Sequence, residues 1–153
     1  MIRETVAGLW RRWLRLRRPD GSDEPATAAM GRWGEEQAAA WLRREGYRIL
    51  GRRVRPGGRD EIDLVVRHGE ILAFVEVKTR RSRGLLAPSA AIDRRKKRAL
   101  GRAAARYLRR LSYPRLVYRF DVVEVIGTPD SGEPAIRHIR DAFRFGPRVR
   151  FPG

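Results

Sequence analysis

The stretch EIDLVVRHGEILAFVEVKTR, residues 61–80, decides the fold. Its two apolar halves read as strands, and the short His68-Gly69 connection between them favours a β-hairpin. Side chains alternate faces along a strand, so Asp63 should project from one strand, and Glu76 and Lys78 together from its partner. The hairpin would therefore present three charged side chains on one surface.

The patterns on both sides of the hairpin predict an α/β fold, a mixed sheet flanked by helices. The expected order is helix, three strands, helix, strand, followed by a small last strand. The expected bounds are a helix over 28–45 that stops at Gly46, strands over 47–55, 61–67 and 70–78, a helix over 88–111, and strands over 116–126 and 135–139. On the second strand, Ile62 and Leu64 should share the face opposite to that of Asp63.

The length of 153 residues suits one domain with short extensions. We expect a basic amphipathic helix over 1–18, a linker over 19–27, the domain over 28–141 and a basic irregular tail over 142–153. The first helix could touch lipid, nucleic acid or a partner, but packing on its own domain is commoner, and membrane contact is disfavoured. No apolar run has the length of a signal peptide or membrane span, so we expect a cytoplasmic protein.

The charge balance predicts a polyanionic partner. The chain has 35 Lys plus Arg against 18 Asp plus Glu, a net charge of +17, which favours nucleic acid. A GC-rich genome could account for the excess of Arg over Lys, but not for the net charge. The chain has no cysteine, which excludes disulfides and thiolate metal sites, so any metal must be held mainly by oxygen.

Three acids, Glu35, Asp63 and Glu76, are candidate metal ligands. Glu35 has the spacing of the apolar face of its helix, which is unusual for an acid. Carboxylates suit Mg²⁺ or Mn²⁺, ions that activate water and neutralise charge on a phosphate. Lys78, a compact cation, would complete the catalytic set by steadying the attacking hydroxide or the charge on the phosphate. Taken alone, Glu-x-Lys is a weak signal, because polar alternation on a half-exposed strand produces it by chance.

Five motifs follow one another between residues 30 and 126: GRWGEE at 31–36, GYRIL at 46–50, EIDL at 61–64, FVEVKTR at 74–80 and FDVV at 120–123. In this order they resemble the bacterial YraN-like family. The resemblance implies a restriction-endonuclease-like, or PD-(D/E)xK, core similar to that of archaeal Holliday-junction resolvases. It also implies that Glu35, Asp63 and Glu76 bind metal and that Lys78 is the catalytic lysine.

Asp60 departs from that family's pattern, because the position before the Glu-Ile-Asp segment is usually glycine. The added acid could perturb the turn or the charge balance of the metal site. We expect it instead to lie harmlessly in solvent.

Arginines predict a phosphate-binding face. On the second long helix they recur every fourth residue with few acids among them, and others follow Lys78 in a basic loop. The expected nucleic-acid contacts are Arg94, Arg98, Arg102 and Arg106 on the helix and Arg80, Arg81 and Arg83 in and before the loop. Nothing here reads base sequence, so sequence-independent or structure-selective binding is expected.

Two functions stay open at this point. The favoured one is a metal-dependent endonuclease that hydrolyses phosphodiester bonds in DNA, with branched or junction DNA as one substrate class. A junction substrate would make a homodimer natural. The alternative is a noncatalytic nucleic-acid-binding module that keeps the fold. Both predict salt-sensitive binding, and binding of metal between Asp63 and Glu76 would separate them.

Overall fold

The computed structural model describes residues 26–82, 92–112 and 117–145. The predicted helix over 1–18, most of the predicted linker, Arg83, Pro88 and the end of the predicted tail lie outside these ranges. The helices of these ranges lack the uninterrupted apolar length that spanning a bilayer requires.

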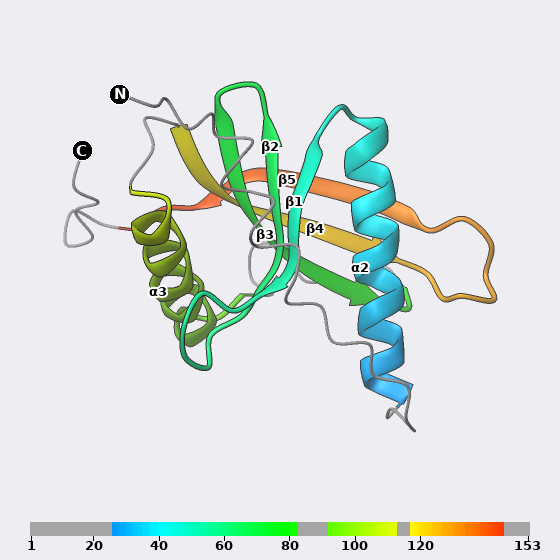
Figure 1. The fold of residues 1–153 in the computed structure, drawn as a ribbon. Coiled ribbons are helices and arrows are strands. Elements are labelled where there is room, and N and C mark those ends of the chain that lie inside the picture. The colour runs from blue at the N-terminus through cyan, green and yellow to red at the C-terminus, as the bar shows by residue number, and fades with distance from the viewer. Residues whose placement is uncertain (1–25, 83–91, 113–116, 146–153) are drawn as a thin grey trace.

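A five-stranded mixed sheet lies between two helices (Figure 1). The strands lie in the sheet in chain order, with β3 and β4 parallel and the other neighbours antiparallel. The elements are α2 (Ala26–Arg44), β1 (Arg48–Val54), β2 (Ile62–His68), β3 (Ile71–Arg80), α3 (Arg94–Arg110), β4 (Val117–Ile126) and β5 (Ala135–Phe143). This confirms the predicted α/β class, the mixed sheet and the order of its elements.

The two helices cover opposite faces of the sheet (Figure 1). Leu42 of α2 belongs to a buried cluster with Leu64 and Val75 of the sheet. On the other face, Leu100 of α3 belongs to a cluster with Phe74. Because β3 is buried on both faces, its sequence runs apolar almost without interruption up to Glu76.

Gly46 ends α2, as predicted. It adopts a left-handed φ of 87°, which glycine takes without steric cost. The Tyr47 amide donates to the Leu42 carbonyl at 2.9 Å and the Gly46 amide to the Arg43 carbonyl at 3.0 Å, the pair of bonds that closes a Schellman motif. The chain is thereby turned back into β1.

Two predicted boundaries were wrong. α3 begins at Arg94 rather than at residue 88, because the Asp93 carboxylate caps it by accepting a hydrogen bond from the Lys96 amide at 2.8 Å. β5 continues to Phe143 rather than ending at residue 139, so residues 142 and 143 belong to the sheet and not to an irregular tail. Phe143 pairs with Phe120 in register and stacks on its ring at a centroid distance of 5.0 Å.

The predicted hairpin is present, but one side chain lies on the wrong face. β2 and β3 pair from Leu64 opposite Val75 to His68 opposite Ile71. Ile62 packs in the cluster on the α3 side, whereas Leu64 packs on the α2 side. Simple alternation fails here, where Ile62 still pairs with Val54 of β1 but the ladder with β3 has not yet begun.

Gly34 lets α2 approach the sheet closely. A Cβ atom at this position would overlap the Oγ1 of Thr79 on β3, a short branched side chain that cannot swing away. Gly31, one turn earlier, has nothing within 4 Å of the place where its Cβ would be.

We therefore predict opposite effects for two alanine substitutions in the same helix. Gly34→Ala should lower the free energy of unfolding by about 1–3 kcal/mol, because α2 or Thr79 must shift. Gly31→Ala should raise it by about 0.5–1 kcal/mol, because it only removes the cost of a helical glycine. Urea denaturation followed by circular dichroism measures both, and a stable Gly34→Ala protein would contradict the close approach.

Candidate metal centre

Asp63 lies where β2 separates from β3. The backbone pairing of the two strands begins only at Leu64, one residue later. In place of a β2 carbonyl, the Oδ2 atom of Asp63 accepts the hydrogen bond of the Val77 amide at 2.8 Å. The carboxylate is therefore fixed between the two strands at the end of the hairpin ladder.

Glu76 is buried, with 3% of its surface exposed, and it projects toward α3 as Phe74 does. Two lysines compensate its charge. Lys78 Nζ lies 3.2 Å from Oε1, and Lys96 Nζ, which comes from α3, lies 3.4 Å from Oε2. Although Lys96 is within ion-pair range, Oε2 accepts no hydrogen bond.

A pocket of about 430 Å³ opens beside these acids. Its walls are the first three turns of α2, Asp63 at the start of β2, and the end of β3 with the residue that follows. The residues that line it include Glu35, Asp63, Glu76, Thr79 and Arg81. All three acids predicted from the sequence therefore line one pocket.

Glu35 is not joined to the other two acids. Its carboxylate is held by Arg53 of β1, whose Nε and Nη2 donate at 2.8 and 3.3 Å. Among the residues that the structure describes, no three Asp, Glu, His or Cys side chains are close enough to hold a metal ion together. The geometry thus supplies a pair, Asp63 and Glu76, with Glu35 across the pocket.

The pair has the electrostatics of a cation site. Burial, followed by the repulsion of Glu76, raises the pKa of Asp63 to about 8. Over the described ranges, Asp63 has no ion pair, and the buried Oε2 of Glu76 has no hydrogen bond. Mg²⁺ or Mn²⁺ would supply positive charge at Asp63 and a ligand partner for the unbonded Oε2 of Glu76, so these hard oxygen donors fit such an ion.

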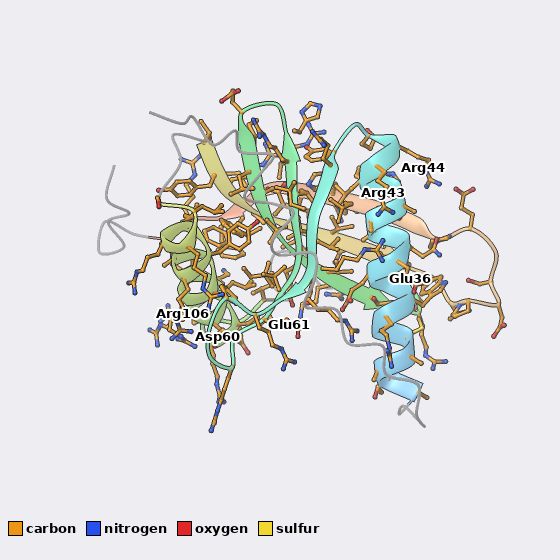
Figure 2. All side chains as sticks on the ribbon, in the orientation of Figure 1. Glu36, Arg43, Arg44, Asp60, Glu61 and Arg106 are labelled. Atoms are coloured by element: carbon orange, nitrogen blue, oxygen red, sulfur yellow. The ribbon has the colours of Figure 1, made fainter. Side chains whose placement is uncertain are left out.

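The arginines of α3 fall into two groups. Arg94 and Arg98 are exposed at its start. Farther along, Arg102 donates to Asp60 at 2.9 and 3.0 Å and Arg106 at 3.2 Å; Figure 2 labels Asp60 and Arg106 where the β1–β2 connection meets α3. The expectation that Asp60 lies in solvent was therefore wrong, because two guanidinium groups bind it and lower its pKa.

The arginines after Lys78 also differ from one another. Arg80 lies with its Nε 3.5 Å from Oε1 of the buried Glu124, so it neutralises an acid of β4. Arg81 is exposed and lines the pocket. Of these two, Arg81 is the side chain placed to meet a ligand in the pocket.

Sequence reasoning missed two features of the charged interior. The first is the ion pair of Lys96 with Glu76. The scarcity of lysine could have pointed to this residue, since Lys78, Lys96 and Lys97 are the chain's only lysines. The second is Asp121, which is fully buried and bonded to Arg119 at 2.9 Å and to His138 at 2.8 Å. No local pattern predicted the contact between Asp121 and His138, because these two residues lie on different strands, β4 and β5.

The raised pKa of Asp63 predicts how stability depends on pH in protein kept metal-free with a chelator. Between about pH 4 and about pH 8 the folded state holds a proton on Asp63 that the unfolded state has released, so the free energy of unfolding falls as pH rises. Asp63→Asn keeps an acceptor for the Val77 amide and abolishes this loss. The variant should exceed wild type by at least about 1 kcal/mol at pH 8 and by much less at pH 4. Equal differences in urea titrations at both pH values would contradict the assignment.

The comparisons with known proteins agree on one family. The model of the uncharacterised protein family UPF0102 matches residues 34–125. A UPF0102 protein of Syntrophotalea carbinolica is 45% identical over 75% of this chain and 91% of its own length. Relatives of the same description from Symbiobacterium thermophilum and Geobacter sulfurreducens are 46% and 41% identical, over 74% and 82% of this chain and 95% and 96% of their own. The matched span contains Glu35, Asp63, Glu76 and Lys78, and the chain belongs to the UPF0102, or YraN-like, family.

Proposed function

We propose that this protein is a divalent-metal-dependent nuclease with a restriction-endonuclease-like core, which hydrolyses phosphodiester bonds in DNA. The observation that carries the proposal is the buried pair of acids: Asp63 has no ion pair in the described ranges and Oε2 of Glu76 has no hydrogen bond, and both line an open pocket. The resemblance of the motifs to nuclease motifs supports the same reading.

Each residue of the site has a distinct task in this proposal. Asp63 and Glu76 hold Mg²⁺ or Mn²⁺, which supplies Lewis-acid chemistry by polarising water and offsetting phosphate charge. Lys78, half-buried beside Glu76, offers an ammonium group to the phosphate. Arg81 at the pocket, with Arg94 and Arg98 on α3, would hold the nucleic-acid backbone.

The second candidate is a noncatalytic nucleic-acid-binding module. It is favoured by the Arg53 contact that occupies Glu35 and by the two lysines that already flank Glu76. A module of this kind would use the Arg face of α3 and would need no metal.

A cleavage assay decides between them. Wild type should cut at least one of single-stranded, duplex, flap or four-way-junction DNA, or RNA, when Mg²⁺ or Mn²⁺ is present, and none with chelator. Glu76→Gln and Lys78→Met should lower the rate by about 100-fold or more, because each removes a charge used at the phosphate. Glu36→Gln, on the exposed side of α2, is the matched control (Figure 2).

Binding without metal-dependent cleavage of any of these substrates would favour the module. Cleavage that survives in both site variants would show that the activity belongs elsewhere in the chain, or to a contaminant.

The proposed binding face makes a separate prediction about salt. Replacing Arg94 and Arg98 together with Gln should weaken DNA binding and reduce the slope of log K against log salt by about 2, one for each lost phosphate contact. The control replaces Arg43 and Arg44 at the end of α2, on the opposite face of the sheet (Figure 2). Fluorescence anisotropy at several salt concentrations measures both, and equal slopes in the two double variants would rule out the α3 face.

A further inference from the structure

Lys96 holds an unusual place at the candidate site. Asp93 caps α3 by accepting the Lys96 amide at 2.8 Å, which fixes the lysine in the first turn of the helix. From there its Nζ reaches Oε2 of Glu76 at 3.4 Å, although 36% of the side chain remains exposed. The ion pair therefore joins the first turn of α3 to the middle of β3.

The two oxygens of Glu76 are held differently from those of other buried acids. Asp121 is bound by the guanidinium of Arg119, and Glu124 lies beside that of Arg80. Around Glu76 both partners are lysines, in a chain where only three of 35 basic residues are lysine. A guanidinium would grip a carboxylate with a fixed fork of donors, whereas an ammonium is a single mobile charge that is more easily exchanged.

Lys97, the next residue, does not share this role. Its Nζ lies over the ring of Phe143, 5.6 Å from the centroid, and so belongs to the packing of α3 on β5. The neighbouring lysines thus differ in surroundings, while their charges are the same.

We propose that Lys96 is the resident counter-ion of Glu76 and competes with the divalent cation for Oε2. Binding of the cation beside Asp63 breaks the Lys96 ion pair and frees that ammonium group from Oε2. The inference rests on the proposed metal site. It assigns Lys96 a role that acts through Glu76. The cation and the Lys96 ammonium group cannot both occupy Oε2 of Glu76 at the same time.

The test measures Mn²⁺ affinity by titration calorimetry, without any cleavage. Lys96→Met should bind Mn²⁺ about tenfold more tightly than wild type, because a competing charge within ion-pair distance is gone. Lys96→Arg should bind it more weakly, because the guanidinium grips Oε2 with more donors. Lys97→Met, one residue away, should match wild type.

A second measurement uses wild type alone, so a variant that folds poorly does not decide the outcome. Trace acetylation read by mass spectrometry should label Lys96 faster when Mg²⁺ is added, since the ammonium loses its carboxylate and faces a cation, while Lys97 keeps its rate. Equal Mn²⁺ affinities in wild type and the folded Lys96 variants, or Lys96 labelling unchanged while calorimetry shows the metal bound, would overturn the competition and leave the nuclease proposal intact. Absence of Mn²⁺ binding in wild type and all folded variants would overturn both.

Discussion

The site depends on one hydrogen bond, from the Val77 amide to the Asp63 carboxylate. A buried amide must be bonded, and where the β2–β3 ladder stops at Leu64 the side chain of Asp63 takes over. β3 itself remains paired with β4 as far as Arg80, so Glu76 is held in place on the other side. A single residue thus both ends the ladder and brings a second carboxylate to Glu76.

Two aspartates of the same sheet illustrate what the fold does with buried charge. Burial alone would raise the pKa of Asp121, but hydrogen bonds from His138, Arg119 and the Asp141 amide lower it overall. Asp63 receives one backbone bond against burial and the charge of Glu76, and its pKa rises. The protein can neutralise a buried acid internally and does so at Asp121. Asp63 has no comparable set of donors, so its charged form is destabilised unless a ligand supplies positive charge, which is the basis of the proposed cation site.

Sequence reasoning succeeded where the chain is locally regular and failed where distant segments meet. Alternation on a paired strand placed Glu76 correctly, and the turn at His68-Gly69 gave the hairpin. The same rule misplaced Ile62, because at that residue β2 pairs with β1 alone. Helical spacing placed Glu35 on the side of its helix that lines the pocket. It could not predict that Arg53, from β1, binds the Glu35 carboxylate. Asp60 and Lys96 find their partners across 42 and 20 residues of sequence, a distance over which no periodicity carries information.

The placement of α3 brings one helix into contact with the buried acid of the proposed metal site. Lys96 touches Glu76 from the first turn of this helix, and an α-helix rises about 1.5 Å per residue, so Arg94 and Arg98 start within about 3 Å along the axis from that contact. Farther along, Asp60 engages Arg102 and Arg106, which weakens their attraction for a second polyanion. Arg94 and Arg98, at the end of α3 that carries the Glu76 contact, are exposed, whereas Arg102 and Arg106 are engaged by Asp60. Lys96 turns toward the buried acid, while Arg94 and Arg98, each two residues away, lie on the other side of the helix and stay exposed, so one rigid turn carries both the Glu76 contact and two surface cations.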